Sequence, residues 1–231
     1  MINVENISVT GFDAAIRGMR NPMNSWDKSD STICPGIDFN DCKTTADKCP
    51  RGEDPEFRED IFCIGKSDLD LMKRLFKAGT EHRKYLRMIH VSMDITAPLY
   101  WWKEFDTYKI GITANSCSTM HKLTAKDFTI DDFSHEHLDA LGMALLEKII
   151  CQLNGFREEY LPNHDKSAWW QMIQILPTSY NQKRTVDMNY ETVVSIISQR
   201  TGHKLDEWNH LVETLKDLPY VQEIMKGSEK E

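Results

Sequence analysis

The segment from residue 79 to residue 121 constrains the fold of this chain most. Gly79 ends an amphipathic helical pattern. Apolar residues then alternate with a period of two: Ile89, Val91, Met93 and Ile95. Such alternation is typical of a strand with one buried face. Pro98 can then occupy the first turn of a helix with aromatic side chains, and a polar run follows at 115–119. The segment therefore predicts a strand joined directly to a helix, with a polar loop after it.

The remaining pattern predicts several helices and few strands. The other expected elements are a strand at 2–10 and helices at 13–20, after Ser67, from Ser134 to Gly155, after Asp187 and after Gly202. An apolar run at 168–176 ends at Pro177. Ser and Asp are expected as helix N-caps because their side-chain oxygens accept hydrogen bonds from the unpaired N–H groups of the first turn. The elements do not alternate regularly, so an α/β (α+β) class is expected.

Length and charge limit the domain count and the partners. The chain has 231 residues, enough for one large domain, expected at 1–226 with a polar tail at 227–231. A long irregular loop rich in Pro and Gly is expected at 21–57. The net charge of −8 argues against nucleic acid or an anionic membrane as a partner. No apolar run reaches about 20 residues and no signal peptide is visible, so a cytoplasmic protein is expected.

The six cysteines are Cys34, Cys42, Cys49, Cys63, Cys117 and Cys151. The first four could form a zinc site or two disulfides, or could simply be reduced thiols. Structural zinc ligands usually pair two to four residues apart, and the wider gaps here favour scattered reduced thiols and no metal. Cys151 lies in a helical pattern and is expected in the core.

Three groups of residues are candidates for chemistry, each with a simpler alternative. His82 follows the Gly79 helix end and could bond a phosphate or a ring, or could only face water. The aromatic residues after Pro98 could stack on a planar ligand, form core, or form a subunit interface. The run 115–119 could line a pocket or could cap a helix. No P-loop, dinucleotide fingerprint or nucleophile elbow is present.

The order of these features resembles the flavin-dependent thymidylate synthases. The resemblance covers about residues 79–210 and consists of spacing more than identity. The matching positions are Gly79, His82, Pro98, Asn115, Ser118, Leu176, Pro177, Asn189, Arg200 and Glu207. Other positions differ from the family: Thr107-Tyr108-Lys109 stands for Arg-His-Arg, and Met120, Ile173 and Glu191 stand where the family has arginines.

The resemblance implies a single domain with a curved mixed sheet flanked by helices, assembled as a homotetramer. It implies methylation of dUMP, or of a related pyrimidine deoxynucleotide, with FAD, NADPH and methylenetetrahydrofolate. The implied cofactor-binding residues are His82, Asn189, Ser195 and Lys109, and the implied substrate-binding residues are Ser118, Arg200 and Asn115. The alternatives are a non-catalytic nucleotide- or flavin-binding protein and a structural oligomeric protein.

Overall fold

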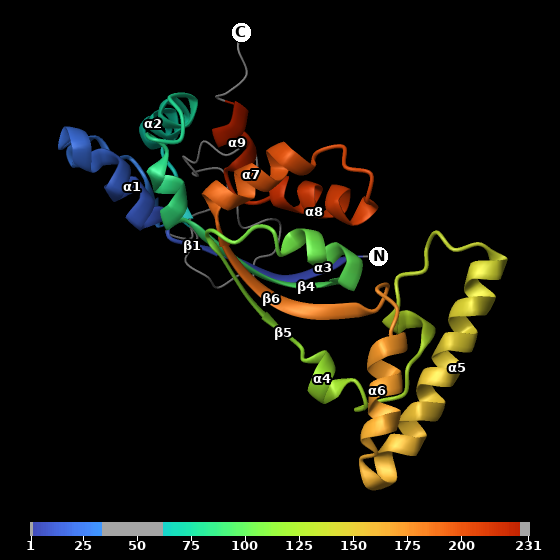
Figure 1. The fold of residues 1–231 in the computed structure, drawn as a ribbon. Coiled ribbons are helices and arrows are strands. Elements are labelled where there is room, and N and C mark those ends of the chain that lie inside the picture. Colours follow the sequence, from blue (N-terminus) through green and yellow to red (C-terminus); the bar gives the residue numbers. More distant parts are fainter. Residues whose placement is uncertain (1, 34–61, 227–231) are drawn as a thin grey trace, which may run out of the picture. The chain divides into compact units, whose positions relative to one another are not determined.

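The computed structural model describes residues 2–33 and 62–226, and it has the predicted mixed α/β class. Figure 1 shows the helices and strands along the chain. One sheet has the strand order β1-β4-β6-β5, made of β1 (Asn3–Thr10), β4 (His90–Pro98), β6 (Asn181–Asn189) and β5 (Ile112–Ser116). A second, antiparallel pair consists of β2 (Thr32–Ile33) and β3 (Phe62–Cys63).

Helices make up most of the rest of the described chain. The α-helices are α1 (Phe12–Arg20), α2 (Lys66–Lys77), α3 (Leu99–Phe105), α4 (Thr119–Lys122), α5 (Ala140–Asn163), α6 (Lys166–Ile175), α7 (Tyr190–Arg200), α8 (Asp206–Lys216) and α9 (Val221–Lys226). Short 3₁₀ turns are η1 (Asn21–Met23), η2 (Trp26–Lys28), η4 (Lys84–Met88) and η5 (Ile130–Asp132). The predicted strand with alternating apolar residues is confirmed as β4, where Ile89, Val91, Met93 and Ile95 are buried. A helix does follow Pro98, but Pro98 is the N-cap of α3, one residue before the first turn in which it was expected.

The chain divides into two compact units. Unit 1 contains the described residues of Met1–Ile7, Met93–Val186 and His203–Leu211. Unit 2 contains the described residues of Ser8–Ser92, Asp187–Gly202 and Val212–Glu231. The strands β1, β4 and β6 each contribute residues to both units.

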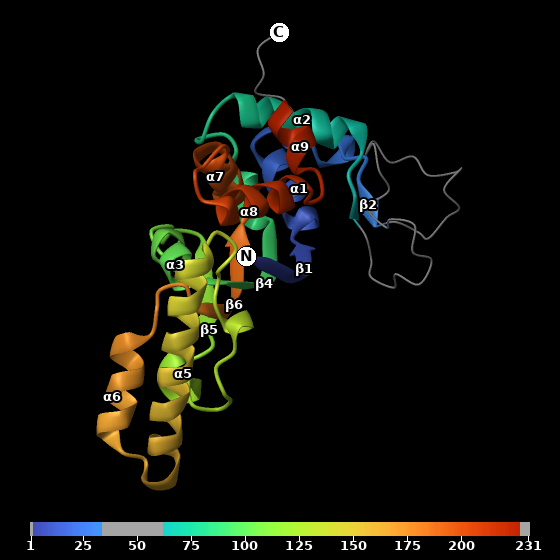
Figure 2. The ribbon, with the colours of Figure 1, turned by 90° about the vertical axis from the view of Figure 1, so that its right-hand side faces the viewer.

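Unit 1 has two apolar clusters. In the first, Trp101, Trp102 and Phe105 of α3 are at most 1% exposed, and the Trp101 ring centroid lies 4.8 Å from that of Trp208. The second joins α5 to α6, which run side by side in Figures 1 and 2, and includes Leu153 and Met172. Trp101, Trp102 and Phe105 are therefore core, one of the simpler predicted alternatives, while Tyr100 is partly exposed.

Unit 2 holds a buried ion pair at the start of α2. Arg20 Nε donates to Asp68 Oδ1 at 2.5 Å, and both side chains are at most 4% exposed. Asp30 Oδ2 and Oδ1 accept from the backbone N–H groups of Ser67 and Asp68 at 2.8 and 3.1 Å. The prediction that Ser67 caps this helix is therefore wrong, because Gly65 is the N-cap residue and Asp30 supplies the carboxylate.

Three more sequence predictions are wrong in position. The helix predicted from Ser134 to Gly155 is α5, which is capped by Asp139 and continues through Gly155 to Asn163, because one glycine does not stop a helix that packs on α6. Asp187 lies within β6 and does not cap the next helix. Cys151 is exposed on α5 and is not core.

Some predictions fall partly outside the described residues. The described part of the predicted 21–57 loop contains η1, η2 and β2, and its remainder lies outside. Cys34, Cys42, Cys49 and the 227–231 tail also lie outside the described residues. Among the described helices, none is long and apolar enough to cross a membrane.

Candidate functional site

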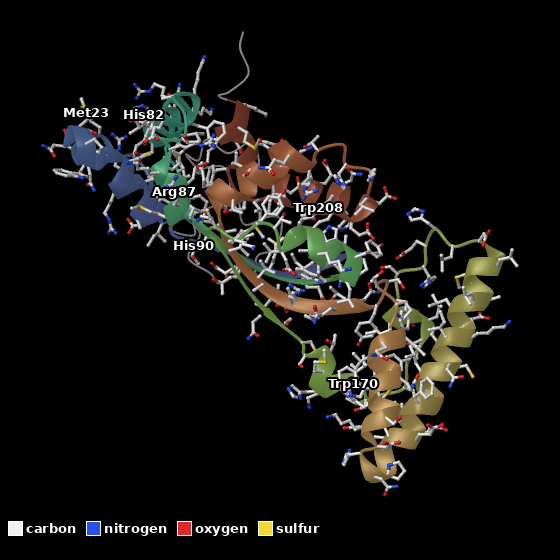
Figure 3. The ribbon with its side chains drawn as sticks, in the orientation of Figure 1. Met23, His82, Arg87, His90, Trp170 and Trp208 are labelled. Carbon is white, nitrogen blue, oxygen red and sulfur yellow. The ribbon has the colours of Figure 1, made fainter. Side chains whose placement is uncertain are left out.

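Three of the four predicted cofactor-binding residues lie in unit 2, on the turn after α2, at the N-cap of α7 and within α7. His82 is exposed, and its backbone N–H donates to the Gly79 carbonyl at 3.0 Å (Figure 3). Gly79 has a φ of +107°, a left-handed conformation that glycine adopts without strain. Its conformation ends α2 and directs the chain into the His82 turn.

Asn189 is the N-cap of α7 and is half-buried. Its side-chain Oδ1 accepts from the Thr192 N–H at 3.0 Å and from the Thr192 hydroxyl at 3.1 Å. An asparagine N-cap satisfies one of the unpaired N–H groups of a helix start and leaves its NH₂ group as a donor. Asn189 therefore has a structural oxygen and a nitrogen that can face a ligand.

Ser195 and Arg200 lie further along the same helix. The Ser195 hydroxyl accepts from Gln199 Nε2 at 2.8 Å, one turn on. Arg200 is half-buried in the last turn of α7, where a cation is favoured by the helix dipole. Unit 2 thus holds four of the seven predicted site residues: His82 on the turn after α2, Asn189 at the N-cap of α7, and Ser195 and Arg200 within α7.

An ion pair that the sequence did not predict connects the His82 turn to the start of α7. Two guanidinium nitrogens of Arg83 donate hydrogen bonds to the Glu191 carboxylate. Nε lies 3.0 Å from Oε2, and Nη2 lies 2.8 Å from Oε1. Each side chain is 19% exposed, and the Arg83 guanidinium also lies 4.9 Å from the centre of the Phe76 ring. His82 therefore lies next to Arg83 in the sequence, and Asn189 lies two residues before Glu191. The sequence could not predict this ion pair, because its two residues are far apart along the chain.

The other three predicted residues lie in unit 1. Lys109 is exposed after α3, and Asn115 is exposed on β5. Ser118 is the N-cap of α4, and its hydroxyl accepts from the His121 N–H at 3.2 Å. The 115–119 run thus includes the helix cap that was its simpler predicted alternative.

Sequence reasoning also missed a polar cluster across β4 and β6. His90 Nδ1 lies 2.9 Å from Asp187 Oδ1, and the Ser92 hydroxyl donates to Asp187 Oδ2 at 2.7 Å. The alternation in β4 could have indicated it, because polar residues at the even positions lie on the face opposite the buried odd positions. The serine bonds the carboxylate and not the imidazole, so the three do not form a serine nucleophile.

A partly buried tyrosine–carboxylate contact lies in unit 1. The Tyr100 hydroxyl donates to Glu207, whose residue is 7% exposed. Burial, and next the Glu207 carboxylate, raise the pKa of Tyr100 above its usual value of 10.0. Tyr100 therefore stays a neutral hydrogen-bond donor. Among residues 2–33 and 62–226 no group of three or more His, Cys, Asp and Glu side chains could hold a metal ion.

The whole fold is similar to solved structures. Thymidylate synthase X from Helicobacter pylori, solved with FAD and dUMP, gives a TM-score of 0.64 at 15% identity, covering 100% of both chains. The UMP/dUMP methylase PolB from Streptomyces cacaoi, solved with 5-Br UMP, gives 0.60 at 11% identity, covering 99% of this chain and 95% of that one. The sequence matches no protein-family model and no curated protein. The chain therefore has the fold of flavin-dependent thymidylate synthases, and the predicted resemblance is confirmed at the level of the fold.

Proposed function

We propose that this protein binds FAD and a pyrimidine deoxynucleotide and methylates the nucleotide, with dUMP or a related pyrimidine as substrate. The observation that supports this most is the similarity of fold over the whole length of an FAD- and dUMP-bound thymidylate synthase. The fold restricts the ligand class, while the chemistry depends on the individual side chains.

Unit 2 offers donors that suit a flavin. His82 is exposed, the Asn189 NH₂ makes no hydrogen bond within the described part of the chain, and Ser195 is half-buried. These three side chains can form hydrogen bonds with the carbonyls and nitrogens of a ring system. When bound, FAD reduced by NADPH would supply the hydride, and methylenetetrahydrofolate would supply the carbon.

Arg200 is the proposed anchor of the nucleotide phosphate. A guanidinium can bond two phosphate oxygens at once, and each charge-assisted bond is worth about 1.5–3 kcal/mol. Lys109 adds a second cation, to the flavin or to the nucleotide phosphate, and Ser118 and Asn115 offer neutral groups for the sugar or base. The exposure of Lys109 and Asn115 is consistent with this role.

A second candidate is nucleotide or flavin binding without methylation. Three positions where the resemblance predicts arginines favour it. Ile173 packs against the α5–α6 apolar cluster, and Met120 is 52% exposed without charge. Glu191 brings a negative charge that Arg83 offsets. Fewer cationic side chains are then left to bind the phosphate groups of the ligands than the family pattern provides.

We also propose a homotetramer. The aromatic residues of α3 do not support it, because they are buried within unit 1. Its support is a row of exposed leucines along α5 and just before it: Leu138, Leu141 and Leu145, at 44%, 82% and 60% exposure. Apolar side chains gathered on one helix side are typical of a surface that is covered in an assembly.

The absorption spectrum of freshly purified protein, before and after added FAD and gel filtration, tests the flavin proposal. Flavin bands that stay with the protein peak are expected. A colourless protein that retains no FAD would contradict it and would favour the structural alternative. Retained FAD with dUMP binding but no methylation would favour the second candidate.

A further inference from the structure

The 3₁₀ turn η4 carries a compact basic surface in a chain of net charge −8. Residues 82–93 contain no Asp or Glu, and include Arg83, Lys84 and Arg87. Arg83 is neutralised by Glu191. Lys84 and Arg87 are both exposed, and neither forms a hydrogen bond or ion pair with the described residues. Figure 3 labels Arg87 on this turn, between His82 and His90.

The geometry of a 3₁₀ turn brings these two cations together. Residues three apart eclipse each other in a 3₁₀ helix, and the rise of about 2.0 Å per residue separates them by about 6 Å along the axis. Lys84 and Arg87 are three apart, so their side chains leave the same side of the turn. Both cationic ends can therefore reach one diphosphate group.

The rest of the turn is held in place by buried contacts. The Tyr85 hydroxyl donates to the Met72 carbonyl at 2.9 Å, and Leu86 is fully buried. The Ile89 carbonyl accepts from the Tyr190 N–H at 2.9 Å. Gly11, at a φ of +95°, approaches so closely that an added Cβ would lie 2.0 Å from the Met88 carbonyl oxygen. A rigid backbone presents the two cations with little ordering cost on binding.

We infer that Lys84 and Arg87 form an anion site for the diphosphate group of a nucleotide. Arg87 can supply a planar fork of N–H donors and Lys84 a compact point charge. Two cations suit one diphosphate, and the strongly negative remainder of the chain disfavours a nucleic acid backbone. The diphosphate can come from a free nucleoside diphosphate or from FAD, and the FAD assignment rests on the proposed function.

The test compares binding of ADP, FAD and riboflavin to the whole protein by calorimetric titration. Lys84→Ala/Arg87→Ala is expected to weaken ADP and FAD binding at least tenfold and to leave riboflavin, which has no phosphate, unchanged. The matched control is Lys73→Ala/Arg74→Ala, which removes the same charge from α2, beside an open pocket of about 730 Å³ that those residues line. The control is expected to bind all three as the wild type does. Circular dichroism checks that both variants are folded.

The outcomes separate this site from the flavin proposal. Loss of ADP binding in the Lys84/Arg87 variant alone supports the site, even where the wild type does not bind FAD. Three results would overturn it: no ADP binding by the wild type, unchanged ADP binding in the Lys84/Arg87 variant, or an equal loss in the α2 control. Equal FAD binding by wild type and variant, together with unchanged ADP binding, would overturn the site while the flavin proposal stands.

Discussion

At the scale of single residues, Asn189 has two ends with separate roles. Its oxygen caps α7 and its nitrogen is proposed to face the flavin. Replacing both His82 and Asn189 with alanine is expected to reduce FAD retention at least tenfold, about 1.4 kcal/mol. Flavin absorbance after gel filtration measures the retention.

A second double variant, Asn189→Asp with His82→Ala, separates loss of the NH₂ donor from loss of the helix cap. Aspartate is as good an N-cap as asparagine but has no NH₂ group, so the helix keeps its cap and loses the donor. We expect this variant to lose FAD with an unchanged melting temperature. Unchanged FAD retention in either folded double variant would show that these residues do not hold the flavin.

Arg200 is the residue on which nucleotide binding is expected to depend. Arg200→Ala is expected to abolish binding of dUMP and dTMP while the protein stays folded, because the side chain is only half-buried at a helix end. Arg200→Lys keeps the charge and should retain part of the affinity. Calorimetric titration measures both; an alanine variant that binds as the wild type does would place the phosphate anchor elsewhere.

At the scale of elements, the start of α2 depends on the Asp68 carboxylate. Its Oδ2 accepts from the hydroxyls of Ser29 and Ser31, at 2.7 and 2.6 Å, while Arg20 bonds Oδ1. Burial pushes the pKa of Asp68 up, but the hydrogen bonds from Ser31, Ser29 and Arg20 outweigh it, so the pKa lies below its usual 3.8. The ionised form is therefore the one that stabilises the fold.

Asp68→Asn is expected to lower the free energy of unfolding by about 3 kcal/mol, because the buried Arg20 loses its counter-charge. The folded-state pKa of Asp68 is depressed, so its contribution is complete above 3.8 and is lost as the pH falls through the folded-state value. Urea unfolding of wild type and variant is compared along a descending pH series. The difference between their free energies of unfolding should shrink only below pH 3.8. Asp70→Asn, on the exposed side of α2, is the control. A difference that persists in acid would contradict this account.

The exposed leucines of α5 lead to a prediction about assembly. Leu141→Lys/Leu145→Lys is expected to convert the proposed tetramer to species near 26.8 kDa, because charges would replace the apolar contact. Glu147→Lys is the control, since it adds a lysine about 200° around the helix from Leu145. Light scattering measures the mass. A wild type that is already a monomer would contradict the proposed homotetramer.

At the scale of the whole molecule, the sequence predicted the class, most elements and the family of folds. The alternation at 89–95, Pro98 and the helical stripes depend on local periodicity, and each was found close to its expected position. The single domain at 1–226 stays a prediction, although β1, β4 and β6 each extend through both units.

The failures have a common physical cause. Asp30 caps α2 from 36 residues before its first residue, Lys66, and Arg83 finds Glu191 on another element, so neither is visible in a local pattern. Asp187 was expected as a helix cap from its residue type, but its strand partners His90 and Ser92 decide its position. Sequence spacing selected four candidate site residues that the structure finds in unit 2 and three that it finds in unit 1. It could not reveal which of their atoms are already bonded.

Release of tritium from dUMP labelled at C5 reports methylation of the pyrimidine ring, the reaction proposed for this protein. With FAD, NADPH and methylenetetrahydrofolate supplied, we expect tritium release that requires all three and is lost in Arg200→Ala. Tight dUMP and FAD binding without tritium release would contradict the catalytic proposal and favour the non-catalytic binding protein.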